Sequence, residues 1–272
     1  NSFSTTLRDQ LGFFTSQQIK NGEYVGNWIG FNGSVDLYYD FNPNNSITSN
    51  LSIGGYKKTN EGLDQNTLQY GAENPFTYFV SDTMDNTDTE YEYTMNYIKK
   101  FNNNEEQELN IGLQYGWHVH DDNHFIKQYN YLDNSIDNNN DVTGDEITIQ
   151  IDYTHPFGDE NKIELGLKNV QRYSTVDYET FISNPIEGTI LTYDSLSNIF
   201  NYNQNVSAAY ISSSFQLPRK YAMLMGLRYE KTMIEGDYIN FYDPFGPIKY
   251  SNIVPSVIMS KKLNMFQTIK IS

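Results

Sequence analysis

The chain has no cysteine, only 2 tryptophans and few basic residues: 18 Lys and Arg stand against 34 Asp and Glu among 272 residues. Without cysteine the sequence offers no disulfide evidence about its compartment, although a cysteine-free chain is compatible with an oxidising cell envelope. The formal net charge of −16 excludes nucleic acid as a partner, because no basic face is available to displace the counterions of a polyanion.

Long apolar runs are also missing. No stretch approaches the roughly 18 to 20 apolar residues that a membrane helix needs, and no basic segment followed by an apolar one opens the chain. Strands must therefore form any part that spans a membrane. Hydrophobic residues make up only 38% of the chain, yet 23 Tyr and 16 Phe raise the aromatic share to 15%. Disordered chains are poor in aromatic residues, so this composition indicates a sheet that is wet on one face.

Apolar and polar residues alternate with a period of two along most of the chain, which places them on opposite faces of strands. In the strand predicted at 108–120, one face carries Leu109, Ile111, Leu113, Tyr115, Trp117 and Val119. The other face carries Glu108, Asn110, Gln114, His118 and His120. The same alternation predicts further strands at 31–41, 146–154 and 221–230, weaker ones at 46–58, 90–100 and 161–168, and ambiguous ones at 205–217 and 251–263. We count about ten strands.

The connections alternate between two kinds. Short turns rich in polar or turn-forming residues follow Phe41, Phe101, Phe157, Leu217 and Leu263. Long polar connections are expected at 59–89, 121–145, 178–204 and 239–249. Outer-membrane barrels alternate short periplasmic turns with long extracellular loops in this way. Aromatic and apolar residues gather beside the short turns, as an interfacial girdle would require: Tyr38, Tyr39, Phe41, Phe215, Leu217 and Tyr221.

We therefore predict an all-β fold: a transmembrane antiparallel up-and-down β-barrel with about ten meandering strands, in the bacterial outer membrane. A large soluble β-sandwich or jelly roll would also alternate. Charges in the middle of the polar faces, and the strict alternation of short and long connections, favour the barrel.

Three C-terminal stretches carry a family resemblance. The first, 205–217, is rich in small residues around Tyr210; the second, 221–238, contains the run from Gly226 to Glu230; the third, 251–272, opens with Val254, Pro255 and Ser256. Together they resemble the C-terminal barrel of TonB-dependent outer-membrane receptors, in the Tyr- and Asn-rich "outer membrane β-barrel" branch of that superfamily.

The resemblance implies a barrel of about twenty-two strands around an N-terminal plug, which takes up siderophores, vitamins or glycans with energy from TonB. We expect residues 1–272 to be a single partial transmembrane barrel domain, with the plug and the remaining strands outside them. Residues 1–27 look like the tail of a connection, and 266–272 stop before they could span a membrane.

The resemblance also implies partners: outer-membrane lipid and lipopolysaccharide, the rest of the barrel with its plug, and TonB and a surface lipoprotein. Two functions stay open. The chain is expected to be the barrel segment of a TonB-dependent receptor-like transporter; the alternative is a structural barrel subunit that acts as a scaffold in a larger outer-membrane complex without transport.

A histidine cluster is the most tempting candidate site for zinc or copper. His118 and His120 share the polar face of one strand, and His124 with Asp121 and Asp122 could return from the following connection. Histidine is also ordinary on such surfaces, so we predict no metal site and no cofactor. Asp, His and Ser occur without fixed spacing or a nucleophile elbow, so we predict no catalytic residues and no enzyme activity. The ligand-binding residues cannot be read from the sequence.

Two further sets of charges are expected at the surface. Lumen-facing charges would pair with one another or hold a plug: Asp36, Glu108, Asp152, Glu164, Lys168, Arg228 and Glu230. Acidic residues of the long connections form solvated surface, or bind divalent cations that bridge lipopolysaccharide phosphates: Asp82, Asp85, Asp88, Glu90, Asp133, Asp137 and Asp141.

Overall fold

The computed structural model describes residues 2–8, 14–71, 73–101, 104–130, 134–158, 161–184, 188–239 and 245–272. They form one antiparallel sheet of twelve strands, in which eleven follow one another as a meander and β8 pairs with β7 alone. The strands are β1 (Ser2–Arg8), β2 (Phe14–Asn42), β3 (Asn45–Tyr70), β4 (Phe76–Phe101), β5 (Asn104–Tyr129), β6 (Ser135–Phe157), β7 (Asn161–Asn184), β8 (Thr189–Thr192), β9 (Asn198–Leu217), β10 (Tyr221–Tyr238), β11 (Phe245–Lys262) and β12 (Thr268–Ile271). This confirms the predicted all-β, up-and-down fold.

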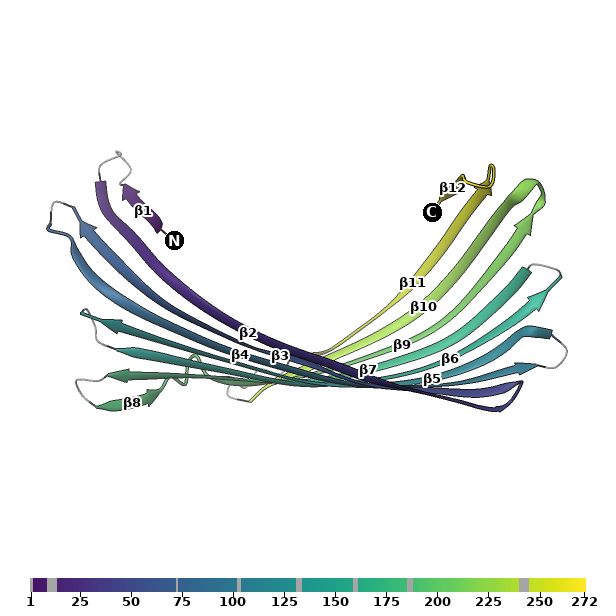
Figure 1. The fold of residues 1–272 in the computed structure, drawn as a ribbon, viewed down its shortest axis with the longest axis horizontal. Helices are drawn as coiled ribbons and strands as arrows, with labels where there is room; N and C mark the ends of the chain where they lie inside the picture. Colours follow the sequence, from purple (N-terminus) through teal and green to yellow (C-terminus); the bar gives the residue numbers. More distant parts are fainter. Residues whose placement is uncertain are drawn as a thin grey trace.

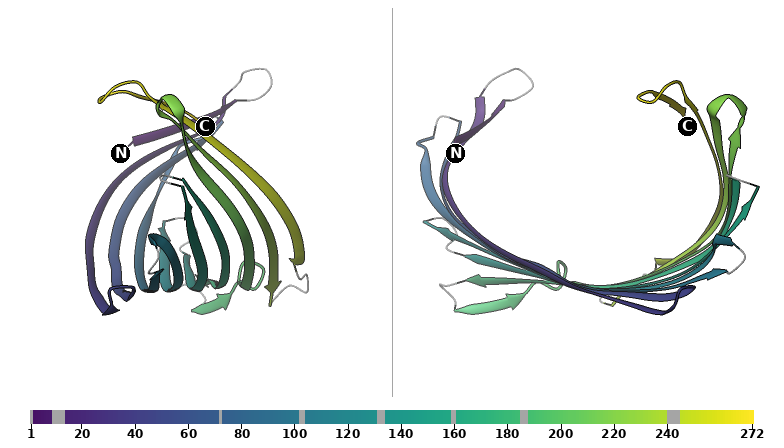
Figure 2. Two further views of the ribbon diagram at one scale, coloured as in Figure 1. Left: turned by 90° about the vertical axis from the view of Figure 1, so that its right-hand side faces the viewer. Right: turned by 45° about the vertical axis from the view of Figure 1, so that its right-hand side comes forward.

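The sheet curves into a trough, with the N-terminus at one edge and the C-terminus at the other (Figures 1 and 2). The path runs from β1 to β12 without a pairing between these two outer strands, so the described sheet is open. Within the described residues, no helix has the length and apolar character needed to cross a bilayer.

The register between neighbouring strands keeps odd-numbered and even-numbered side chains on opposite faces across the whole width of the sheet. From β2 to β11, even-numbered residues pair with even-numbered ones and odd with odd, up to the bulges near the strand ends. Because side chains alternate along each strand, every odd-numbered side chain then lies on one face of the sheet.

One row of directly paired residues shows the result. Reading across nine neighbouring strands, from β2 to β11, the row consists of Tyr39, Ile47, Tyr97, Ile111, Ile151, Leu167, Ala209, Tyr229 and Ile253. All nine are apolar or aromatic. The odd-numbered face therefore carries a continuous band suited to lipid, as the alternation predicted.

The even-numbered face is the concave one. Side chains converge on the inside of a curved sheet and diverge on its outside, so buried residues mark the concave side. The buried side chains that the strands contribute are all even-numbered: Asp64, Asn66, Thr148, Val170, Thr180, Ala208 and Thr232. Most are polar, which is the composition of a barrel lumen.

The long connections are shorter than predicted. Residues 59–70 and 76–89 continue β3 and β4, and most of 121–145 and 178–204 is likewise strand, as are 245–249. The alternation of apolar and polar residues did not predict these strand extensions, because it occurs only where one face of a strand meets lipid and the other meets water. Beyond the membrane both faces are wet, and paired strands there carry polar residues on both sides. The expectation that residues 1–27 form a connection was also wrong, since Phe14 begins β2 and Ser2–Arg8 is β1.

The short turns lie where the sequence placed them, and they share one end of the sheet (Figure 1). Aromatic pairs gather on the strands beside them: Tyr39 with Phe41 at 4.9 Å between ring centroids, and Phe157 with Phe215 at 5.9 Å. These pairs form the predicted girdle at that interface. Tyr38, also expected in the girdle, lies on the polar, concave face of β2.

Replacement of Ile111 by Arg tests the assignment of the two faces. Ile111 sits near the middle of the lipid-facing band and is 39% exposed, so Ile111→Arg should cost about 2–4 kcal/mol of folding free energy in a bilayer. Its neighbour Asn110 lies on the concave face opposite Asp152, so Asn110→Arg should cost less than about 1 kcal/mol. Urea titration of folding into phospholipid vesicles measures both; equal losses would contradict the assignment.

Candidate functional site on the concave wall

A tyrosine cluster lies on the concave wall where β6, β7, β9 and β10 meet. The Tyr210 hydroxyl donates to the Asp152 carboxylate, and Gln150 Nε2 donates to both the Tyr210 oxygen at 3.1 Å and Asp152 Oδ2 at 2.7 Å. The Arg228 guanidinium lies 5.8 Å from the centre of the Tyr210 ring and donates to Glu230 Oε2 at 2.9 Å. The contacts of Tyr210 with Asp152 and Gln150 join residues about sixty positions apart, which register alone brings together.

Gly166 makes room for this cluster. It pairs directly with Tyr210, and a Cβ added there would overlap the tyrosine ring. A tyrosine that lies across a cross-strand glycine covers the bare backbone and is held close to the wall. The Tyr210 ring can therefore reach Asp152 on β6, two strands away.

The predicted lumen charges pair only in part. Lys162 pairs with Glu164, which also accepts from Ser212 Oγ at 3.0 Å. Asp36 accepts from Asn50 Nδ2 at 2.7 Å. Within the described chain, Glu108 and Lys168 form no ion pair. The ion pairs that involve these predicted charges, Lys162–Glu164 and Arg228–Glu230, each lie along a single strand.

A hollow of about 340 Å³ lies further from the short turns, over β4 to β9. Gly116 forms its floor and has open space above it, and Glu92 and Glu146 flank this glycine on the two neighbouring strands. Glu92 accepts from Gln114 at 2.9 Å, and Arg172 donates to Glu146 at 2.5 Å. The hollow is acidic overall, since Glu90 on the concave face lies in its lining as well. Sequence reasoning did not find it, because its members come from separate strands.

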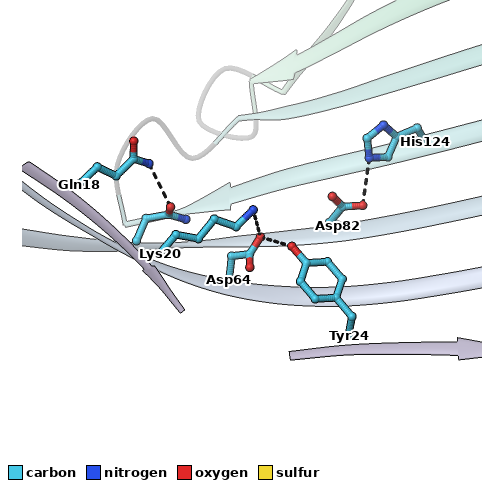
Figure 3. A network of polar contacts seen from close by, with 7 residues as sticks. Gln18, Lys20, Tyr24, Asp64, Asp82 and His124 are labelled. Atoms are coloured by element: carbon cyan, nitrogen blue, oxygen red, sulfur yellow. Dashed lines mark hydrogen bonds and ion pairs between the residues drawn. The ribbon is translucent and has the colours of Figure 1, made fainter. Parts of the chain in front are cut away.

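A second polar network holds the far ends of β2 and β3 (Figure 3). Asp64 is only 1% exposed; its Oδ2 lies 2.6 Å from Lys20 Nζ and accepts from the Tyr24 hydroxyl at 2.7 Å. The adjacent carboxylate raises the pKa of both Lys20 and Tyr24 through these hydrogen bonds. Gln18 Nε2 donates to Asn66 Oδ1 at 3.2 Å beside them.

The histidines are distributed rather than gathered. His118, His120 and His124 share the concave face of β5 with Asp122, whereas Asp121 lies on the convex face. Each of two histidines meets an aspartate on β4: His120 Nδ1 is 3.3 Å from Asp88 Oδ2, and His124 Nε2 is 2.9 Å from Asp82 Oδ1. In the part of the chain that the structure describes, no three His, Cys, Asp or Glu side chains come together as a metal would need.

Three aspartates do face one another outside the membrane band. Asp121, Asp141 and Asp177 are directly paired across β5, β6 and β7, well beyond the roughly 9–11 residues of each strand that cross a bilayer. Partial burial, together with the charges of Asp121 and Asp177, raises the pKa of Asp141 above its ordinary value of 3.8. Such like-charge neighbours on adjacent strands are destabilising at neutral pH.

The two faces and the turns of the sheet together define a class of protein. A lipid-suited convex face, a polar concave wall and an aromatic band beside the short turns belong to the wall of an outer-membrane β-barrel. Residues 99–272 match the Outer membrane protein beta-barrel family. The chain belongs to this family, which places it in the outer membrane.

The fold is similar to that of a solved outer-membrane transporter. The ferric citrate transporter FecA in its unliganded form superposes with a TM-score of 0.50 at 8% identity, over 97% of this chain and 42% of that one. The ferric yersiniabactin uptake receptor FyuA from Yersinia pestis gives a TM-score of 0.47 at 9% identity, over 90% and 45%. The chain thus spans less than half the length of these receptors. No curated protein matches it.

Substitution of Gly166 tests the tyrosine cluster. Gly166→Ala should displace the Tyr210 ring from Asp152 and Gln150 and cost about 1–3 kcal/mol, the range typical of overpacking. Gly116→Ala is the matched control, because nothing lies within 4 Å of its added Cβ; it should cost nothing. Urea unfolding from vesicles measures both. If Gly166→Ala lowers the free energy of unfolding no more than Gly116→Ala does, the position of the Tyr210 ring does not depend on Gly166.

The three facing aspartates, Asp121, Asp141 and Asp177, make the stability of the β5–β7 extension depend on pH. The pKa of Asp141 is higher in the folded state than in the unfolded state, so the folded state binds the proton more tightly. The folded state therefore gains stability as the pH falls through the folded pKa, and the gain is complete below the unfolded pKa of about 3.8. Asp141→Asn should therefore stabilise the β5–β7 extension at pH 7 by a few tenths to about 1 kcal/mol. Amide hydrogen exchange reports this. Asp137→Asn is the control, since Asp137 faces Phe125 and Phe181.

Proposed function

We propose that this chain forms the barrel wall of a TonB-dependent receptor that carries a substrate through the outer membrane. Membership of the outer-membrane barrel family supports an outer-membrane transporter-like barrel. The observation that favours passage is the concave wall, which is polar and carries open hollows of about 240, 340 and 470 Å³. A wall that only supported other subunits would not need such open, charged hollows.

Strand direction supports a larger barrel. In a meander of eleven antiparallel strands the first and the last run in the same direction, so β1 and β12 could pair directly only as parallel neighbours. Outer-membrane barrels are antiparallel throughout and mostly have an even number of strands. Closure then requires an odd number of further strands between these two edges. A plug inside the closed barrel, TonB below it and a surface lipoprotein above it belong to the same proposal.

The substrate class is a siderophore, a vitamin or a glycan. FecA and FyuA are named for ferric citrate and ferric yersiniabactin, and with 8% and 9% identity they support the fold of this chain rather than either compound. The charges on the concave wall give information on the substrate itself. The hollow over Gly116 is acidic, so it favours a neutral or cationic group on the molecule that passes it.

Blocking the hollow tests transport. In a Gram-negative host that carries the whole protein, Gly116→Trp should fill the open space over residue 116 and lower the uptake of the transported compound. Ser49→Trp, on the lipid face of β3, is the control and should leave uptake unchanged. Ferric chelates, cobalamin and oligosaccharides are the compounds to supply, with and without a collapsed proton gradient. If none enters in an energy-dependent way, the protein is a scaffold and the transport proposal is wrong.

A further inference from the structure

Four cations gather at the short-turn end of the sheet, in a chain that is otherwise strongly acidic. Arg219 and Lys220 lie in the single-turn 3₁₀-helix Pro218–Lys220 between β9 and β10, and Lys261 and Lys262 end β11, which pairs with β10. Tyr221, the next residue after the turn, pairs directly with Lys261. The four are hereafter called the basic patch.

The basic patch has no internal counter-charge. None of its members forms an ion pair within the described residues, and the formal net charge of the chain is −16. Three of the four are exposed, and Lys261 is half-buried with its Nζ 4.6 Å from the centre of the Tyr221 ring. By register Lys261 lies on the convex face and Lys262 on the concave face, but Lys262 follows the last β10–β11 pair and stands at the rim of the sheet beside the turn, where its long side chain extends to headgroup level. Unpaired cations gathered at one rim repel one another unless an anion lies between them.

Apolar side chains stand next to the basic patch. In the turn that follows Lys262, Met265 is 82% exposed and Phe266 is 93% exposed, with Leu263 beside them. Exposed aliphatic and aromatic side chains next to lysines are typical of segments that enter the headgroup region of a bilayer, with the apolar part in the acyl boundary and the cations at the phosphates.

The position of the basic patch along the strands places it at the level of the lipid headgroups. It lies at the same end of the sheet as the aromatic pairs Tyr39–Phe41 and Phe157–Phe215, which mark the membrane interface. Lys99 at the end of β4 repeats the arrangement, with its Nζ 5.4 Å from the centre of the Phe101 ring. Cations at this depth reach lipid phosphates rather than the acyl chains.

We propose that the basic patch binds the phosphate of an anionic phospholipid in the leaflet on the short-turn side, with Leu263, Met265 and Phe266 inserted beside it. Lys and Arg bind phosphate through charge-assisted hydrogen bonds, and clusters of four or more such residues beside a membrane recognise anionic lipids. The site concerns the anchoring of the barrel and is independent of the substrate it transports.

Retention of phosphatidylglycerol by the whole protein tests the site. The protein is reconstituted in nanodiscs of phosphatidylcholine with phosphatidylglycerol, transferred to detergent, and its bound lipids are counted by native mass spectrometry. The quadruple variant Arg219→Gln, Lys220→Gln, Lys261→Gln, Lys262→Gln should bind phosphatidylglycerol about tenfold more weakly than the unmodified protein. Retention of phosphatidylcholine should not change.

The matched control removes four cations that lie away from the short turns: Lys57→Gln, Lys58→Gln, Lys127→Gln and Lys249→Gln. Lys127 also lies over an aromatic ring, 4.9 Å from the centre of Tyr129, so the control resembles the basic patch in local chemistry. It should retain phosphatidylglycerol as the unmodified protein does. Heat-modifiable migration in electrophoresis shows whether each variant has folded.

The unmodified protein supplies a second measurement should the quadruple variant not fold. Raising the salt from about 0.1 to 1 M shortens the screening length from about 10 to 3 Å and should release phosphatidylglycerol but not phosphatidylcholine. Salt-independent retention, equal loss of both lipids, or equal binding by the quadruple variant and its control would overturn the proposal. So would release of a co-purifying protein by the quadruple variant with lipid binding intact, because a protein then occupies the basic patch.

Discussion

Pairing of backbone N–H and C=O groups between neighbouring strands is the constraint on which the rest of this structure depends. In the hydrocarbon region of a bilayer nothing else can satisfy these groups, so the strands must stay paired in register across the sheet. The register holds from β2 to β11, with irregularities only near strand ends. One consequence is that parity alone assigns a side chain to lipid or lumen. A shift by one residue in any strand would turn its charges toward lipid.

Curvature then gives the two faces different chemistry. On the convex side apolar side chains spread apart and present a band such as the row from Tyr39 to Ile253. On the concave side polar groups converge, so Asp64 and Thr232 become almost inaccessible and small residues such as Gly166 are needed beneath larger ones. Buried polar groups require hydrogen-bond partners, and Tyr210, Asp152 and Gln150 supply them for one another.

The two ends of the sheet also differ, because they meet different surroundings. The short-turn end carries aromatic pairs and the basic patch, where side chains meet lipid headgroups. The opposite end extends beyond the membrane as paired strands that are polar on both faces, and there carboxylates such as Asp121, Asp141 and Asp177 face one another. Lys20, Tyr24 and Asp64 tie the extension of β2 to that of β3. This difference between the two ends is the one that outer-membrane barrels show between their short periplasmic turns and their long extracellular connections.

The sequence by itself determined the strand faces, the short turns and the membrane environment, because each is a local pattern: alternation at period two, or turn residues beside Phe41 and Leu217. It could not show that the connection expected at 59–89 is mostly strand, since a strand solvated on both faces has no hydrophobic period. Only the tertiary structure decided which residues meet across strands. His120 and His124 face aspartates on β4 instead of each other, and Glu92 and Glu146 flank Gly116. Such contacts follow from register between strands, which no local pattern encodes.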